Sequence, residues 1–189
     1  MSKVPQLVAF AGSHRKDSHN VKLVQAAAEV ARAHGAKVEF IDLGALPMPI
    51  FDEDLEAQGT PANATTFKEK LKAADGFLIA TPEYNSSYPA LLKNVIDWAS
   101  RPAEGEARLA AFKCKACGIL AASPGAQGGT RVLPQLRTLL SNIGVHVMPT
   151  QFGLNNAHEA FDDAGALKNE AARERLTAVV TQTIEIASR

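Results

Sequence analysis

A loop near the start of the chain combines the groups that bind a phosphate. After the apolar run 7–11 it carries the hydroxyls of Ser13 and Ser18, the guanidinium of Arg15 and the amide of Asn20. With the backbone N–H groups of a helix start, these donors would satisfy a dianion. The glycine pattern of a dinucleotide site and the lysine of a triphosphate-binding loop are absent, so the loop favours one phosphate. Ser18 or Asn20 could instead only cap the helix, with Arg15 in solvent.

A second loop could hold a flat ring. It follows the apolar run 76–80, turns at Pro82 and presents an aromatic side chain at Tyr84. Pro82 stiffens the turn, and backbone N–H and C=O groups beside an aromatic can meet both the polar edge and the face of an isoalloxazine ring. The other interpretation is an ordinary strand-to-helix turn, in which Asn85 or Ser86 caps the next helix and Tyr84 merely packs.

A third loop is rich in small residues and could form a wall on the other side of such a ring. It begins at Ser123, after the apolar run 116–122, and contains Gly125, Gly128 and Gly129. Glycine has no Cβ and allows positive φ, so the main chain can approach a ligand closely. A glycine-rich surface turn would have the same composition.

The three loops reinforce one another, because each follows a run typical of a buried parallel strand and open parallel sheets bind ligands at the carboxyl ends of their strands. The apolar runs alternate with helical patterns. This alternation predicts an α/β fold in a single domain over 1–189, a doubly wound parallel sheet of five strands with helices on both faces. We predict strands at 6–12, 37–42, 76–80, 116–122 and 146–151, and helices at 20–34, 63–74, 130–143 and 167–187.

Two further segments are interpreted from their composition. Residues 44–61 contain prolines at 47, 49 and 61 and an acidic patch, so we expect a long loop over or near the cleft. The polar segment 155–163 fits a solvated loop, or a contact with substrate or with another subunit.

The helix after the second loop has an apolar stripe and a tryptophan beside it. Trp98 lies off the centre of the stripe, so we expect it to reach a partner subunit, where large aromatic residues are common. The alternative is a tryptophan folded back on its own core. The stripe consists of Leu91, Leu92, Val95, Ile96 and Ala99.

The formal charge is balanced, with 20 Lys+Arg and 20 Asp+Glu. This balance does not support binding to nucleic acid or to an anionic membrane. No apolar run approaches the roughly 18 residues of a membrane-spanning helix. The N-terminal residues lead into a strand without the pattern of a signal peptide, so we expect a soluble, cytoplasmic protein.

Both cysteines lie in one motif, Cys114-x-x-Cys117. A redox pair normally follows a strand at a helix start, whereas this pair precedes a strand. A zinc site would need further ligands, and the five histidines show no ligand spacing. We expect Cys117 to be buried as a small apolar residue, and no metal site.

Together the loop motifs resemble the NADPH-dependent FMN reductase family, which includes quinone and chromate reductases. The resemblance extends from about residue 7 to the last helix. It rests on Gly12-Ser13-x-Arg15-x-x-Ser18-x-Asn20, Pro82-Glu83-Tyr84-Asn85, Lys93-Asn94-x-x-Asp97-Trp98 and Ser123-x-Gly125-x-x-Gly128-Gly129.

The resemblance implies a flavodoxin-like fold, FMN as cofactor, NADPH or NADH as co-substrate, and homodimers or homotetramers with active sites near a subunit interface. It also implies the cofactor-binding residues. These would be Ser13, Arg15, Ser18 and Asn20 at the phosphate, Pro82, Glu83, Tyr84 and Asn85 along the ring, and Ser123 and Gly125 in the third loop.

The expected function is therefore that of a flavin-dependent NAD(P)H oxidoreductase. FMN takes a hydride from a nicotinamide and then passes electrons to an acceptor at the same face, which predicts ping-pong kinetics. The acceptor could be a quinone, free flavin, chromate, a ferric chelate, or an azo or nitro compound. We expect no side chain to act as acid or base. Arg101, Arg108 and Lys113 are candidates for contact with the 2′-phosphate of NADPH.

Two other functions remain open at this point. A flavodoxin-type electron carrier would share the fold and FMN but would not use a nicotinamide. Such carriers dock through a strongly acidic surface, which a balanced chain does not favour. A flavin-free binding module would be colourless and could not be reconstituted with FMN.

Overall fold

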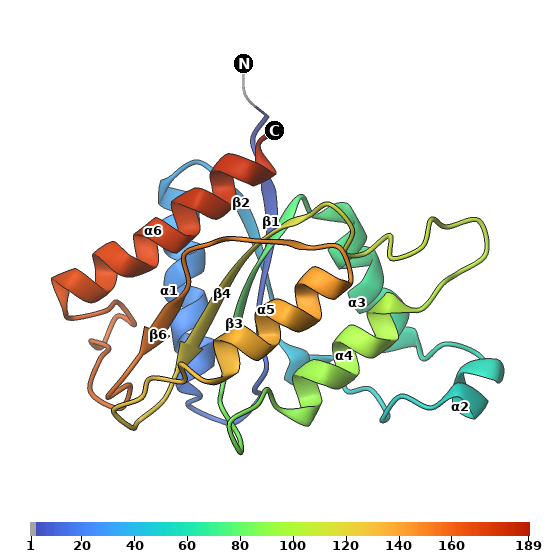
Figure 1. Ribbon diagram of the computed structural model, residues 1–189, viewed down its shortest axis with the longest axis horizontal. Coiled ribbons are helices and arrows are strands. Elements are labelled where there is room, and N and C mark those ends of the chain that lie inside the picture. Colours follow the sequence, from blue (N-terminus) through green and yellow to red (C-terminus); the bar gives the residue numbers. More distant parts are fainter. Residues whose placement is uncertain (1–2) are drawn as a thin grey trace.

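A parallel sheet lies at the centre of the protein, whose computed structural model describes residues 3–189 (Figure 1). The strands follow the order β2-β1-β3-β4-β5, and β6 also pairs with β4. Every described pair is parallel, and the order is the flavodoxin-like one, as predicted. The strands are β1 (Gln6–Ala11), β2 (Lys37–Ile41), β3 (Gly76–Thr81), β4 (Ala116–Ala122), β5 (His146–Val147) and β6 (Phe152–Leu154).

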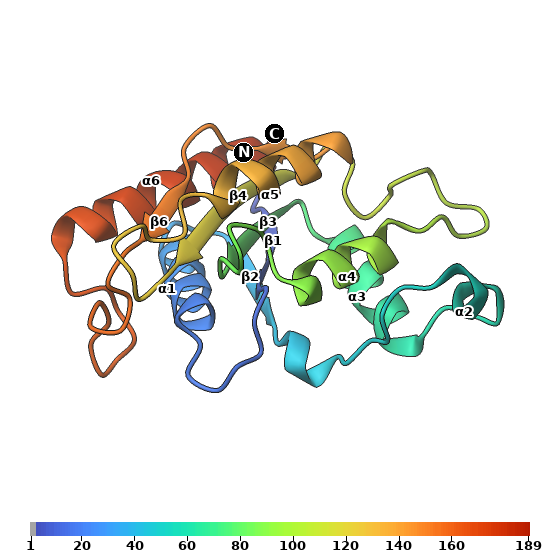
Figure 2. The same ribbon diagram turned by 60° about the horizontal axis from the view of Figure 1, so that its bottom comes forward.

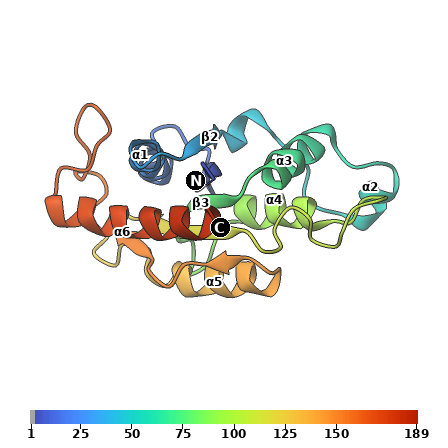
Figure 3. The same ribbon diagram turned by 90° about the horizontal axis from the view of Figure 1, so that it is seen from above.

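Each face of the sheet has its own helices, because alternate strand residues point to opposite faces. Leu7 and Ala9 lie in one core with α1 and α6, whereas Val8 and Phe10 lie in a second core with α3, α4 and α5 (Figure 3). Within the described chain, no helix is long and apolar enough to cross a membrane. The helices are α1 (His19–Ala33), α2 (Glu53–Ala57), α3 (Ala62–Ala73), α4 (Ala90–Ser100), α5 (Val132–Asn142) and α6 (Glu170–Ala187).

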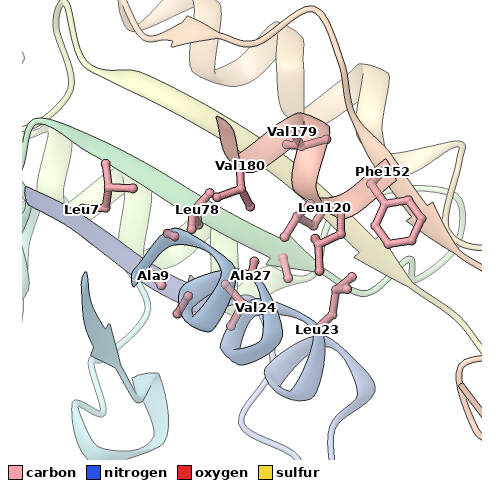
Figure 4. Close-up of a cluster of buried hydrophobic side chains, with 14 of the residues drawn as sticks. Leu7, Ala9, Leu23, Val24, Ala27, Leu78, Leu120, Phe152, Val179 and Val180 are labelled. Atoms are coloured by element: carbon pink, nitrogen blue, oxygen red, sulfur yellow. The ribbon is translucent and has the colours of Figure 1, made fainter. Parts of the chain in front are cut away.

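The core beneath α1 and α6 depends on a close approach of α6 to the sheet. Val24 of α1, Val180 of α6 and Leu78 of β3 belong to this core (Figure 4). A Cβ on Gly118 of β4 would lie 2.7 Å from Oγ1 of Thr183 in α6. A larger residue at this position would therefore push the helix away from the sheet.

The fifth strand, predicted at 146–151, is split into two short pieces. β5 pairs with the first residues of β4 and β6 with its last residues. Between them lies Pro149, which has no N–H to donate to a neighbouring strand. Arg137 of α5 donates to the carbonyls of Val147 at 3.2 Å and Met148 at 2.7 Å. The guanidinium thus satisfies backbone groups in the interruption.

The segment 44–61, predicted as a loop, overlaps a 3-10 turn at Leu43–Ala45 and contains the helix α2. The Asp52 side chain caps α2 by accepting from the N–H of Asp54 at 2.8 Å. Asn94 of α4 holds the stretch before it, since its side chain donates to the carbonyl of Pro49 at 2.9 Å. The acidic residues, which together with the prolines led us to expect a long loop, thus favour a short helix.

Trp98 does not reach the surface, so the expectation that it contacts a partner subunit is wrong. Its side chain is 1% exposed, and Nε1 donates to the carbonyl of Pro49 at 2.9 Å. Its ring lies edge-on to Phe51, with centroids 5.0 Å apart. The segment before α2 covers this side of α4, which widens the buried stripe beyond what the helix pattern alone predicts.

Candidate functional site

The loops that follow β1, β3 and β4 lie along one edge of the sheet (Figure 2). Gly12, after β1, donates its N–H to the carbonyl of Ala80 in β3 at 2.8 Å. A Cβ on Gly12 would lie 3.0 Å from Cβ of Leu92 in α4, so glycine lets the first loop pass close to this helix. The fold therefore brings the predicted residues of all three loops to one edge.

The first loop presents buried hydroxyls at the start of α1. Ser13 and Ser18 are both buried, and Ser18 caps α1 by accepting from the N–H of Val21 at 3.4 Å. The N–H groups of His19 and Asn20 have no hydrogen-bond partner in the described chain. Unpaired N–H groups at a helix start carry the positive end of the helix dipole, so they suit an anion.

Arg15 lies on the same loop but turns its guanidinium back onto the main chain. Its terminal nitrogens donate to the carbonyls of Lys16 and Asp17, each at 3.1 Å. Asp17 has a φ of 58°, so the loop turns sharply at this point. The exposed Arg15 side chain would have to leave these carbonyls, or share its donors, to reach a phosphate.

Asn20 joins the first loop to the third, a contact that the motif did not indicate. The residue is 3% exposed. Its Nδ2 donates to the carbonyl of Ala122 at 3.0 Å, and its Oδ1 accepts from the N–H of Ala122 at 2.8 Å. Both ends of the amide are thus engaged at the end of β4, and one Nδ2 hydrogen is left for a ligand.

The second loop forms a tight hairpin. Tyr84 and Ser87 exchange backbone hydrogen bonds of 2.9 and 3.0 Å, and Asn85 and Ser86 between them have φ of 52° and 64°. Positive φ at both positions is the pattern of a type I′ turn. Tyr84 is 54% exposed. Since α4 begins only at Ala90 and has no side-chain cap, the alternative that Asn85 or Ser86 caps it is wrong.

Glu83 connects the second loop to the helix that follows the third. Its Oε2 accepts from the N–H of Arg131 at 3.0 Å and from that of Val132 at 3.1 Å. Arg131 is the N-cap position of α5 and provides no side-chain cap of its own. A carboxylate from elsewhere in the chain thus caps α5, which the helix dipole favours. The structure thus gives Glu83 a role in joining the second loop to α5.

In the third loop, two of the three glycines are required by the protein's own packing. Gly128 and Gly129 have φ of 58° and 73°, and a Cβ on Gly129 would lie 2.7 Å from Cβ of Ala121. A Cβ on Gly125 would meet only Oγ of Ser123, at 3.6 Å. The Gly125 N–H donates to this oxygen at 3.1 Å, so the Ser123 hydroxyl hydrogen remains available as a donor.

The cations suggested for the 2′-phosphate do not gather at this edge. Arg101 binds Glu56 at 2.8 Å and lies over the ring of Phe51, and the hydrogen bond to Glu56 raises the pKa of Arg101. Lys113 shortly precedes β4 and so lies at the amino end of the sheet, opposite the three loops. The suggestion for Lys113 is therefore wrong. Arg108 is exposed in the connection that leads to the same amino end.

His19 is a titratable residue of the first loop that the motifs did not identify. It is the first residue of α1, and its Nδ1 is buried without a hydrogen-bond partner in the described chain. Burial lowers the pKa of His19, and the positive charges of Arg15, Lys22 and His158 lower it further. The imidazole is thus neutral at pH 7 in the protein alone.

The cysteines are divided by the start of β4. Cys117 is fully buried, as predicted, and burial raises the pKa of its thiol. Cys114 is exposed. In residues 3–189, no group of three or more His, Cys, Asp and Glu side chains is placed to hold a metal ion.

The residues of the three loops fit an FMN. The unpaired N–H groups at the start of α1 and the two buried hydroxyls suit its phosphate. In the described chain the N–H groups of Glu83 and Asn85 lack partners and flank the exposed Tyr84, as a polar ring edge requires. Two grooves of about 500 and 340 Å³ lie beside α6, and none of these residues lines them. The site is therefore identified by its hydrogen-bond donors and not by the volume of a groove.

Comparison with known proteins gives the same assignment. The sequence model of the NADPH-dependent FMN reductase family matches residues 5–159. An NAD(P)H-dependent FMN reductase of Pseudomonas aeruginosa is 37% identical over 175 residues, covering 92% of this chain and 90% of that protein. An NAD(P)H:quinone oxidoreductase of Solanum tuberosum is 36% identical, covering 94% and 90%.

Solved structures agree with the fold. The flavoenzyme NAD(P)H:(acceptor) oxidoreductase FerB from Paracoccus denitrificans superposes with a TM-score of 0.85 at 29% identity, covering 97% of both chains. An archaeal flavodoxin shares the fold alone, with a TM-score of 0.62 at 7% identity, covering 97% of this chain and 99% of that one. The chain therefore belongs to the NADPH-dependent FMN reductase family and is an FMN-dependent NAD(P)H oxidoreductase.

Proposed function

We propose that this enzyme passes electrons from NADPH or NADH to a small organic acceptor, with quinones as the first candidates. The proposal rests on two features that lie on one edge of the sheet. One is the phosphate cradle, which we define as the buried hydroxyls of Ser13 and Ser18 with the unpaired N–H groups at the start of α1, and the other is the exposed turn at Tyr84. Relatives from Pseudomonas putida and Solanum tuberosum are named quinone reductase and NAD(P)H:quinone oxidoreductase, which supports this class of acceptor.

The FMN phosphate would bind in the first loop. The hydroxyls of Ser13 and Ser18 and the free N–H groups of His19 and Asn20 are its nearest donors. Arg15 would add a positive charge once its guanidinium turns from the loop carbonyls. Asn20 would also keep the start of α1 against β4 through Ala122, with one amide hydrogen left for the phosphate.

The ring would lie between the second and third loops. FMN held there would supply the hydride and electron transfer between the nicotinamide and the acceptor. The backbone from Pro82 to Asn85 would hold the polar edge of the ring, and Tyr84 would shape the open face where the two substrates take turns. The Ser123 hydroxyl, with the Gly125 region behind it, would donate toward the ring edge that becomes more negative on reduction.

One open face used twice predicts ping-pong kinetics and a broad choice of acceptor. Chromate, ferric chelates, free flavin, and azo and nitro compounds could reach the same face.

We propose a cytoplasmic homodimer or homotetramer as the active unit. Trp98 does not supply the contact, whereas Ile50 and Tyr84 expose large hydrophobic side chains, 72% and 54% exposed. Sedimentation of the FMN-loaded protein would test this assembly.

The central test is an assay of purified protein reconstituted with FMN. We expect flavin absorbance, oxidation of NADPH or NADH that depends on benzoquinone, and parallel double-reciprocal plots at several quinone concentrations. Rates with NADPH and NADH would establish the preferred nucleotide. FMN binding without nicotinamide oxidation would instead indicate an electron carrier, and failure to bind FMN would indicate a flavin-free module.

A further inference from the structure

Helix α5 is attached to the turn that we assign to the flavin ring, residues 82–87, here called the ring turn. We propose that Gln135 and Glu83 are positioning residues, which fix the ring turn against α5 and thereby set how the flavin ring and its acceptor are held. The inference rests on the proposed function, because it takes the ring turn as the site of the isoalloxazine.

Gln135 holds the ring turn from the helix side. Its Oε1 accepts from the hydroxyl of Ser87 at 2.7 Å, and its Nε2 donates to the carbonyl of Ser86. Gln135 is otherwise exposed. One amide therefore engages two successive residues of the turn, although the two segments are 48 residues apart in the chain.

Glu83 makes the attachment in the opposite direction. Its carboxylate caps α5 through the N–H groups of Arg131 and Val132. The turn thus provides the cap of the helix, and the helix provides two side-chain hydrogen bonds to the turn. Because the two contacts lie at different positions along α5, they restrict the rotation of the turn as well as its distance from the helix.

The ring turn needs such support because its own bonding is slight. It is closed by the backbone pair of Tyr84 and Ser87. Asn85 and Ser86 both have positive φ, a conformation that asparagine tolerates but that is unfavourable for serine. A two-residue hairpin with no sheet behind it is marginally stable in water. Contacts from α5 therefore decide which orientation the turn adopts.

α5 is a rigid reference for this purpose. Val132, Leu133 and Leu136 are buried against the sheet. Arg137, two residues beyond Gln135, holds the interruption between β5 and β6 through the carbonyls of Val147 and Met148. The helix is thus fixed on the side away from the turn. Within residues 3–189, the side chains of Gln135 and Glu83 make no hydrogen bond to the loop before α1, where the phosphate would bind.

This arrangement predicts a separation between phosphate binding and turnover. Gln135→Leu removes both hydrogen bonds from the helix to the turn but leaves the cradle at α1 unchanged. The loss of two hydrogen bonds should shift the equilibrium between the attached and the detached turn by roughly five- to thirtyfold. We expect kcat/KM for the acceptor to fall by the same factor, because only the attached turn holds the ring and the acceptor correctly. The FMN dissociation constant should rise by less, and the visible circular dichroism of bound FMN should change.

The experiment compares Gln135→Leu with Gln25→Leu, the same substitution at an exposed position of α1. A second pair of variants tests Glu83. Glu83→Ala removes the cap of α5 and should lower kcat/KM for the acceptor. Glu83→Gln keeps an oxygen that can accept from both α5 N–H groups, so it should retain most of the wild-type kcat/KM. Urea unfolding of each variant shows whether a change merely follows stability.

Three results would separate the possible failures. If FMN-loaded Gln135→Leu has the same visible circular dichroism and the same kinetics as the wild-type protein, this inference is wrong, while the proposed function is unaffected. An equal effect in Gln25→Leu, or a loss that parallels the urea midpoint, would also overturn it. Failure of the wild-type protein to bind FMN would overturn the proposed function, and with it this inference.

Discussion

Replacement of Asn20 by alanine tests whether this residue acts mainly as a connection between α1 and β4. The substitution leaves the buried N–H and C=O of Ala122 without their partners at 2.8 and 3.0 Å. A buried unsatisfied group costs about 1–3 kcal/mol. Because Ala122 ends its strand and the space left by the side chain can admit water, we expect a total loss of about 2–4 kcal/mol in the free energy of unfolding.

The measurement is urea unfolding of the flavin-free protein, followed by far-ultraviolet circular dichroism. The slope of the transition should stay the same while its midpoint falls. Asn155→Ala is the matched control, since this asparagine is exposed and we expect a change within about 0.5 kcal/mol. If Asn20→Ala is as stable as the control, the two bonds to Ala122 do not hold the loops together.

Asn20→Asp refines the same test. The aspartate can still accept from the N–H of Ala122 but cannot donate to its carbonyl, and it places a negative charge beside the proposed phosphate cradle. FMN binding should therefore weaken more in Asn20→Asp than in Asn20→Ala. Equal flavin affinities in the two variants would show that the phosphate lies elsewhere.

The strands of the sheet could be predicted where burial alone determines the sequence. β3 and β4 are buried on both faces and appear as uninterrupted apolar runs, and the predicted bounds of β4 agree with the structure. The fifth strand could not be predicted in the same way. Its interruption depends on Pro149 together with Arg137, which comes from another element.

Trp98 illustrates the same limit for a helix. Its spacing places it beside the apolar stripe of α4, but the pattern of one helix does not show what covers that side. Pro49 and Phe51 cover it, from a segment more than 40 residues earlier in the chain. The prediction of an exposed tryptophan failed for this reason.

The site shows which functional features local motifs can indicate. Residue types and spacing located the three loops at one edge of the sheet, because each loop follows its strand directly, whereas the binding of FMN by their residues stays a prediction. The bonds between loops were not predictable, since Asn20 with Ala122 and Glu83 with Val132 join distant segments. Gly129 is a different case, because the packing against Ala121 already requires a residue without a Cβ there.

The remaining predictions concern the first two loops. Arg15→Ala should weaken FMN binding by about 1.5–3 kcal/mol, the range for a hydrogen bond to a charged group, without altering the fold; unchanged affinity in a flavin titration would refute the assignment of Arg15. Tyr84→Ala should change turnover or acceptor preference more than FMN affinity, and identical kinetics with two unlike acceptors would count against it. His19 predicts a pH effect on stability in the absence of FMN. Its pKa is lowered by burial and by Arg15, Lys22 and His158, so the unfolded state binds the proton more readily. The free energy of unfolding should therefore decrease as the pH falls below the ordinary histidine value of 6.5, and level off once the pH passes the lowered pKa of the folded state. His19→Gln cannot titrate and should lose this part of the pH dependence, as measured by urea midpoints between about pH 7.5 and 5. If the two proteins keep the same slope through this range, the burial and charges around His19 do not act as the structure indicates.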